Sequence, residues 1–242
     1  MSDKDRLFED SPFTVGDFQF DDRVVRVFPD MINRSVPGYA LLIPMIGMLA
    51  RRYAQPDSHI YDLGCSLGAA VLAMRSAVQQ NGVRFVAVDN SAAMMARLEQ
   101  ELAAEEAVSP IELRLEDLDQ TSIENASVTV LNLTLQFLEP RHRQRLLTTI
   151  ARGTRPGGIV LLTEKIRFSD PAEQALQTDW YHDFKRAQGY SILEIASKRD
   201  ALERVLQPDT NHRHLARLRA AGWQTAVRWF QAFNFVSYLA IR

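Results

Sequence analysis

The chain has 242 residues, of which 46% are hydrophobic and 24% are charged. This length and composition exclude a disordered or fibrous protein and favour one large folded domain. The 28 Lys and Arg residues nearly balance the 30 Asp and Glu residues, and the net charge of −2 excludes a globally basic nucleic-acid binder. The single cysteine, Cys65, excludes an intrachain disulfide framework and a thiol-rich metal site.

The first ten residues are polar and charged, without the apolar core of a secretory signal. The longest apolar run, residues 39–50, contains Pro44 and is well short of the ~20 residues needed to cross a bilayer. We therefore expect a cytoplasmic protein.

Residues 1–34 are predicted to form an N-terminal extension ahead of a single domain over residues 35–242. A free tail rarely carries many aromatic side chains, so we expect those of the extension to pack on the domain or on a partner. They are Phe8, Phe13, Phe18, Phe20 and Phe28. Ser35 opens an apolar segment that is predicted to be a buried helix as far as Tyr53, with Pro37 in its first turn.

From His59 onward, apolar strand patterns alternate with helical patterns. Strands that are separated by helices form right-handed βαβ units, so this order predicts a doubly wound, mostly parallel sheet in an α/β fold. The predicted strands are 59–63, 84–89, 110–115, 127–132 and 159–163, and the predicted helices are 69–80, 92–106 and 141–153.

Two further segments complete the predicted fold. Residues 165–214 break the alternation and are expected to form a helical insertion that serves as a lid or a dimer element. Residues 224–230 and 235–241 read as strands that are too close in sequence for a helical crossover, so they should pair antiparallel. The prediction is a seven-stranded sheet that ends in an antiparallel C-terminal hairpin.

The loop over residues 62–68, Asp-Leu-Gly-Cys-Ser-Leu-Gly, is the first candidate site. It follows the first strand and opens a helix, and open α/β sheets bind ligands at the carboxyl ends of their strands. Gly64 allows the backbone to approach a ligand, and Gly68 allows close helix–strand packing. An ordinary tight turn is the alternative, because short glycine motifs often match by chance.

Polar residues follow the next strands. Asp89 ends the second strand. In nucleotide-binding α/β folds, an acidic side chain at this sequence spacing from the glycine loop binds both hydroxyls of a ribose. The alternative role for Asp89 is a helix N-cap, but Ser91 fills that role more naturally. Asp117 and Leu118 follow the third strand, and Asn132 ends the fourth. The G-x-G-x-x-G fingerprint is missing from the first loop, which disfavours a dehydrogenase.

This arrangement resembles the class I S-adenosylmethionine-dependent methyltransferase fold over about residues 55–242. In that fold the first loop holds the amino acid part of the ligand, the acid after the second strand holds the ribose, and the loop after the third strand holds the adenine. Ser66 is a departure, because methyltransferase loops usually have glycine there.

Longer stretches resemble the carboxy-S-adenosyl-L-methionine synthase family, and they reach further than a motif shared by all methyltransferases. They span nearly the whole chain, including the N-terminal extension. The matching stretches are residues 27–39, 62–70, 125–127, 135–140, 182–187, 198–203 and 229–235.

The resemblance implies an enzyme that converts S-adenosyl-L-methionine and prephenate to carboxy-S-adenosyl-L-methionine, phenylpyruvate and water. In that family the product feeds a tRNA carboxymethyltransferase, which installs a carboxymethoxy group on the wobble uridine. The resemblance further implies a homodimer without a metal and without direct contact to nucleic acid. The sequence does not identify the base that deprotonates the methyl group.

The resemblance also assigns site residues. Arg199 is the expected catalytic residue, because its guanidinium can pair with the new carboxylate of the product and with a carboxylate of prephenate. The resemblance leaves open whether Arg199 acts across a dimer interface, and a solvated helix arginine is the alternative. Cys65 reads as a packing residue and not a nucleophile. The expected binding residues are Tyr39 at the sulfonium, Gly64, Cys65 and Ser66 at the methionine part, Asp89, Asn90, Asp117, Leu118, Asn132 and Arg199.

Other charged residues are predicted to be solvated. His212 and His214 point apart on a helix and lack further ligands, so no metal site is expected. The arginines predicted to form exposed surfaces are Arg141, Arg143, Arg145, Arg152 and Arg155, and separately Arg213, Arg217 and Arg219. Two functions remain as alternatives: a methyltransferase of a small acid or RNA, and a non-catalytic cofactor-binding partner of a tRNA-modifying enzyme.

Overall fold

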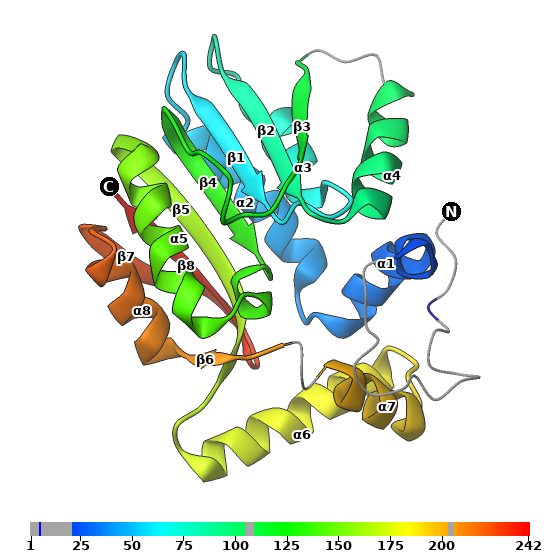
Figure 1. Cartoon of the computed structure of the whole chain (residues 1–242). Helices are drawn as coiled ribbons and strands as arrows, with labels where there is room; N and C mark the ends of the chain where they lie inside the picture. The colour runs from blue at the N-terminus through cyan, green and yellow to red at the C-terminus, as the bar shows by residue number, and fades with distance from the viewer. Residues whose placement is uncertain (1–4, 6–20, 105–108, 203–205) are drawn as a thin grey trace.

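The computed structural model of the chain describes residues 5, 21–104, 109–202 and 206–242, and of residues 198–202 it describes the backbone alone. Its centre is a twisted sheet with the strand order β3-β2-β1-β4-β5-β8-β7 (Figure 1). The strands are β1 (His59–Leu63), β2 (Arg84–Asp89), β3 (Ile111–Leu115), β4 (Ala126–Asn132), β5 (Thr154–Arg167), β7 (Thr225–Ala232) and β8 (Phe235–Ile241).

The direction of the strands confirms the predicted α/β class. Strands β1 to β5 pair in parallel, whereas β8 is antiparallel to both β5 and β7. The strand β6 (Asp209–Thr210) pairs with the end of β5, outside the seven-stranded path. The sequence analysis did not include this strand.

Helices cover both faces of the sheet, which explains why its central strands are continuously apolar. On one face α2 (Tyr39–Tyr53), α3 (Ala69–Ala77) and α4 (Ala92–Ala103) bury side chains such as Ile46, Met74 and Leu98. On the other face α5 (Pro140–Gly153) and α8 (Asn211–Ala220) bury Leu147 and Leu218. Ser91 caps α4 as predicted, because its Oγ accepts from the backbone N–H of Met94 at 3.2 Å.

The N-terminal part differs from its prediction. The helix predicted from Ser35 to Tyr53 begins later, at Tyr39, and a further helix that the sequence analysis did not include, α1 (Asp22–Ser35), ends where it was expected to begin. Gly38 precedes α2 with a φ of +76°, a left-handed conformation that interrupts the helix. Pro37 therefore lies in the turn between α1 and α2. Of the five phenylalanines, Phe28 lies half-buried in α1, and the other four lie outside the described residues.

The segment predicted as an insertion contains α6 (Pro171–Ala187) and α7 (Ile192–Leu202). Both helices lie beyond the carboxyl end of the sheet, on the same side as α1 (Figure 1). Strand β5 is longer than predicted, so that residues 156–158 at one end and Lys165 at the other belong to it. The domain boundaries at residues 34, 165 and 214 stay predictions.

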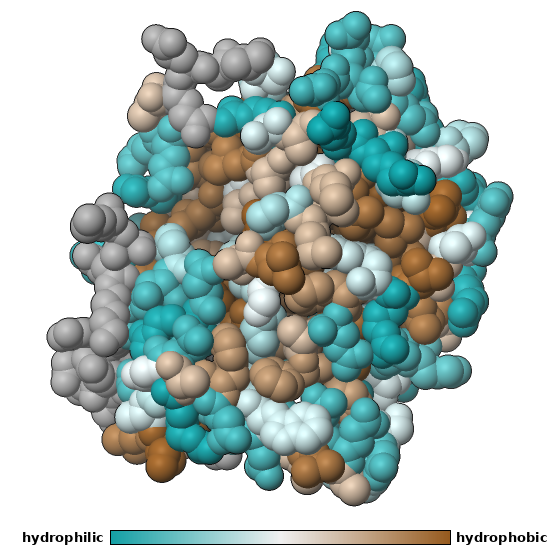
Figure 2. Space-filling model, turned by 180° about the vertical axis from the view of Figure 1, so that it is seen from behind, coloured by the Kyte–Doolittle hydropathy of each residue, from teal (hydrophilic) through white to brown (hydrophobic). Residues whose placement is uncertain are grey.

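The outer surface is mixed. Hydrophobic residues gather over part of the face seen from behind (Figure 2). Large exposed apolar side chains include Leu41 and Met48 of α2 and Val227 of β7. None of the helices in the described part of the chain is long and apolar enough to cross a bilayer.

A buried ion cluster corrects two predictions about exposed arginines. Arg143 is fully buried and lies 2.7 Å from Asp209, and Arg217 lies 2.8 Å from the same carboxylate with 9% of its side chain exposed. The prediction was wrong because the short strand β6 places Asp209 between α5 and α8. Burial alone would raise the pKa of Asp209, but hydrogen bonds from Arg217 and Arg143 outweigh it and hold the pKa at about 2.

This cluster predicts that two arginines with the same partner, Asp209, contribute very differently to the stability of the fold. Arg143→Met should destabilise the fold by about 3 kcal/mol, because a buried carboxylate loses a partner. Arg143 also donates to the carbonyls of Leu138 and Gln136, which would lose their donor. Arg213→Met should cost at most about 1 kcal/mol, because Arg213 contacts Asp209 from solvent with 58% of its side chain exposed. Urea unfolding measures both, and equal losses would contradict the assignment.

Candidate active site

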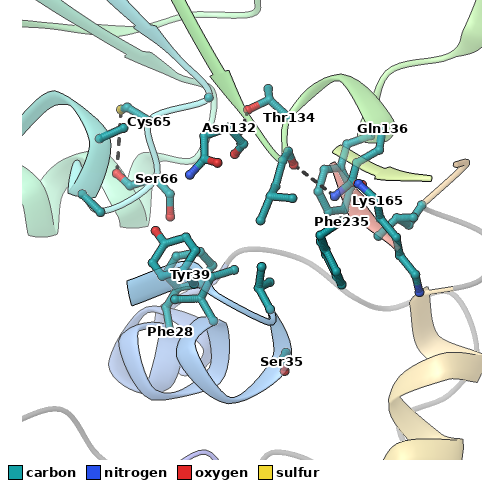
Figure 3. Close-up of a pocket in the computed structure, with 18 of the residues that line it drawn as sticks. Phe28, Ser35, Tyr39, Cys65, Ser66, Asn132, Thr134, Gln136, Lys165 and Phe235 are labelled. Carbon is teal, nitrogen blue, oxygen red and sulfur yellow. Dashed lines mark hydrogen bonds between the residues drawn. The ribbon is translucent and has the colours of Figure 1, made fainter. Parts of the chain in front are cut away.

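A cavity of about 1130 Å³ lies at the carboxyl ends of the parallel strands, beneath α1, the start of α2 and α6. Nine of the ten predicted site residues line this single pocket: Tyr39, Gly64, Cys65, Ser66, Asp89, Asn90, Asp117, Leu118 and Asn132. Figure 3 shows four of them, with Tyr39 facing Ser66 and Asn132 across the pocket. Arg199 lies in α7, but its side chain is outside the described part. That these residues bind a ligand stays a prediction.

The loop after β1 is shaped by its glycines. Gly64 has a φ of +75°, and a Cβ there would overlap the side chain of Thr134. Gly68, with a φ of +78°, packs against Leu98 of α4. Ser66, where related loops usually have glycine, adopts a left-handed φ of +51°. The backbone at Ser66 therefore has the left-handed conformation that glycine usually adopts, although the residue is serine.

Asp89 joins this loop to the end of β2. One carboxylate oxygen accepts from the backbone N–H of Ser66 at 2.8 Å, and the other accepts from Ser91 at 2.9 Å. A carboxylate oxygen can accept more than one hydrogen bond, so both oxygens keep capacity for the hydroxyls of a ribose. Asn90 donates to Asp117 at 2.8 Å and so links the ends of β2 and β3.

Four oxygens of residues that line the pocket are buried and lack a hydrogen-bond partner among the described residues: Asp62 Oδ1, Glu116 Oε1, Asn132 Oδ1 and Asn234 Oδ1. Buried acceptors without donors are costly, so a ligand that carries donors would fit this pocket. Burial raises the pKa of Asp62 to about 7, against the backbone hydrogen bond from Val71. Burial and the nearby Asp62 also raise the pKa of the Tyr39 phenol.

Cys65 has the environment of a packing residue. Its Sγ lies 3.7 Å from Sδ of Met95, and burial raises the pKa of its thiol. A thiol that stays protonated is a poor nucleophile.

The opposite wall of the pocket holds residues that the sequence analysis missed. Lys165 of β5 and Lys185 of α6 both contact the ring of Tyr181, with their Nζ atoms 4.8 and 4.5 Å from its centroid. Burial lowers the pKa of Lys165 to about 8. The rule that strand ends carry site residues, extended from the fourth strand to the fifth, would have found Lys165. Residues 182–187 of α6 are among the stretches that resemble the synthase family, but the resemblance did not assign a role to Lys185.

No metal site accompanies this pocket in the described ranges, since no group of three or more His, Cys, Asp or Glu side chains is placed to hold an ion. His214 is instead buried against the ring of Tyr238, with centroids 5.4 Å apart. Burial lowers the pKa of His214 to about 4.

Two glycines with the same φ allow the stability cost of backbone strain to be measured separately from the cost of steric crowding at this site. Gly64 and Gly157 both have a φ of +75°, but a Cβ at Gly157 would meet no atom closer than 3.7 Å. Gly157→Ala should cost about 1–2 kcal/mol of stability through left-handed strain alone. Gly64→Ala should cost about 1–3 kcal/mol more, because the methyl group also displaces Thr134. Thermal unfolding of both variants measures the difference, and equal losses would show that the loop is not crowded.

Comparisons with known proteins agree with this geometry. A family model described as a methyltransferase domain matches residues 60–158. The structure of human N-acetylserotonin methyltransferase in complex with SAM superimposes with a TM-score of 0.60 at 16% identity, over 91% of this chain and 55% of that one. An O-methyltransferase family 2 protein from Planctomyces limnophilus gives a TM-score of 0.61 at 16% identity, over 93% of this chain and 62% of that one. This chain thus spans less than two thirds of the length of both structures.

Curated relatives are much more similar. The carboxy-S-adenosyl-L-methionine synthase of Erwinia tasmaniensis is 52% identical over all of this chain and 98% of that protein. The synthase of Marinobacter nauticus is 54% identical over 98% of this chain and 95% of that protein. Fold and pocket together define a protein of the S-adenosylmethionine-dependent methyltransferase fold. Within that fold, the chain belongs to the carboxy-S-adenosyl-L-methionine synthase family, as its sequence motifs predicted.

Proposed function

We propose that the chain is an enzyme that converts S-adenosyl-L-methionine and prephenate to carboxy-S-adenosyl-L-methionine, phenylpyruvate and water. The full-length similarity to synthases of that name supports this activity. In the balanced reaction a carboxyl group of prephenate replaces one hydrogen of the methyl group. That hydrogen leaves with the ring hydroxyl as water, and the ring becomes aromatic.

One observation carries the proposal: three of the four unpartnered acceptors of the pocket belong to β1, β4 and the loop after β3, whereas its lysines belong to β5 and α6. S-adenosyl-L-methionine brings a sulfonium, an ammonium group and ribose hydroxyls, which suit the acceptors. Prephenate brings two carboxylates, which suit the lysines. A transferase that joins a cationic donor to a dianionic acid needs both kinds of surface in one cavity.

The binding residues follow from their places around the pocket. The backbone of Gly64, Cys65 and Ser66 would hold the methionine part, with Asp62 Oδ1 accepting from its ammonium group. Asp89 and Asn90 would hold the ribose, and Asp117 and Leu118 would flank the adenine. Tyr39 and Asn132 would adjoin the sulfonium. Helices α1 and α6 cover this region, and we propose that they exclude water from the reacting carbon.

The wider setting is also a proposal. We infer that the enzyme acts as a cytoplasmic homodimer without a metal, and the exposed Leu41, Met48 and Val227 suit contact with a second copy. Its product would pass to a tRNA carboxymethyltransferase that modifies the wobble uridine. The net charge of −2 fits an enzyme that does not itself bind RNA.

Turnover of the purified chain tests the reaction. Incubation with S-adenosyl-L-methionine and prephenate should give a sulfonium product heavier by the mass of one CO2, together with phenylpyruvate, both detected by mass spectrometry. Demethylated S-adenosyl-L-methionine would instead indicate a methyltransferase. Tight retention of the ligand without turnover would indicate a non-catalytic module.

Arg199 should distinguish the carboxylated ligand from its precursor. A guanidinium beside the sulfonium has a partner only when the carboxylate is present, and Lys lacks the planar fork. Arg199→Ala should therefore weaken binding of carboxy-S-adenosyl-L-methionine at least about tenfold, which corresponds to ~1.4 kcal/mol. Arg199→Lys should lose less, and binding of S-adenosyl-L-methionine should change little in both. Calorimetry with the two ligands decides, and a common loss for both ligands would remove Arg199 from this role.

A further inference from the structure

The charged residues that line the pocket are separated by sign along the sheet. The acids belong to β1, β2, α4 and the loop after β3: Asp62, Asp89, Glu101, Glu116, Asp117 and Asp119. The basic groups belong to β5 and α6: Lys165, Arg167, His182 and Lys185. Strand β4 lies between β1 and β5, so it divides the acidic side from the basic side.

Lys165 has no neutralising carboxylate in the part of the chain that the structure describes. Its neighbour Glu164 points to the other face of β5, as alternate residues of a strand do, and accepts there from the backbone N–H groups of Leu135 and Gln136, both at 2.8 Å. No described residue forms an ion pair with Nζ of Lys165. Burial lowers the pKa of Lys165 to about 8, so its ammonium form is destabilised and a bound anion would stabilise it.

Tyr181 fixes the position of the two lysines. Its hydroxyl donates to the carbonyl of Ser35 at 2.9 Å, and its ring contacts the ammonium groups of Lys165 and Lys185. A cation held over a ring face keeps N–H donors for another partner. Figure 3 shows Lys165 beside Phe235, on the side of the pocket opposite Tyr39 and Ser66.

An apolar surface adjoins the lysines. Phe235, Leu133 and Tyr181 belong to one buried hydrophobic cluster, and all three line the pocket. A six-membered carbon ring would pack on this surface while an attached carboxylate reached the lysines.

We propose that Lys165, together with Lys185, binds the carboxylate of the second substrate that the reaction does not transfer, the one on its 2-oxo acid side chain. This assignment rests on the proposed function. The transferred carboxyl must reach the reacting carbon on the side of Tyr39 and Asn132. The retained carboxylate stays on the acid before and after transfer, so a fixed cation on the other side serves both substrate and product.

The test replaces Lys165 by Met, which keeps the length of the side chain and removes its charge. The KM for prephenate should rise about tenfold to a hundredfold, as expected for loss of a hydrogen bond between charged groups. The dissociation constant of S-adenosyl-L-methionine, measured by calorimetry, should stay within about twofold and also reports that the variant is folded. Lys165→Arg should retain most of the affinity. Arg152→Met, an exposed residue of α5 outside the pocket, removes the same charge and should change neither constant.

Phenylpyruvate identifies which carboxylate is bound, because it keeps the 2-oxo carboxylate and lacks the transferred one. Its inhibition constant should rise in Lys165→Met by the same factor as the KM for prephenate. An unchanged inhibition constant with a raised KM would assign Lys165 to the transferred carboxylate and overturn the proposal. Unchanged values of both would also overturn it.

The same variants separate this proposal from the proposed function. If the wild-type chain turns prephenate over and Lys165→Met has the same KM and inhibition constant, the proposed carboxylate subsite is wrong and the proposed function stands. If the wild-type chain gives no carboxylated product, calorimetry with phenylpyruvate still decides the subsite. Tighter binding to wild type than to Lys165→Met would support it, and equal or absent binding would overturn it.

Discussion

The buried carboxyl group of Glu164 holds the loop after β4 in place, and burial raises its pKa to about 8 despite the backbone hydrogen bonds that it accepts. It accepts from two successive backbone N–H groups, those of Leu135 and Gln136, in an interior where they would otherwise lack partners. The ordered loop then presents the Gln136 side chain to the backbone N–H of Lys165 and the Gln136 carbonyl to Arg143. One interaction thus connects the ion cluster beneath the sheet to the cationic wall of the pocket.

The sheet was predictable because its strands are continuous apolar runs that end in polar residues. Phe85 to Val88 are buried without interruption, and Asp89 follows them at the rim. The same logic predicted the pocket residues at the strand ends, whereas Tyr39 at the start of α2 was assigned from the family resemblance. It failed where structure depends on contacts between distant segments. Arg143 looks like a solvated helix residue until the two-residue strand β6, which has no sequence pattern of its own, places Asp209 against it.

The remaining difference between prediction and structure concerns the parts of the pocket that helices outside the sheet form. Strand ends identify ligand-binding residues on the sheet, but α1 and α6 reach the pocket only through tertiary packing. Lys185 and Tyr181 lie on α6 whereas Lys165 lies on β5, so the contact of both lysines with the ring of Tyr181 is visible only in three dimensions. The two methyltransferase structures superimpose on more than 90% of this chain at 16% identity, so the shared fold does not by itself determine the side chains of the pocket.

The hydrogen bond from Tyr181 to the carbonyl of Ser35 joins segments 146 residues apart in sequence. This contact therefore joins the wall of the pocket at α6 to the turn between α1 and α2. The sheet beneath depends on shorter connections and does not need this contact. Separation of α6 from the α1–α2 turn would break this hydrogen bond and would leave the core clusters on both faces of the sheet intact. Under the proposed function, such a separation would open a route for the second substrate into the pocket.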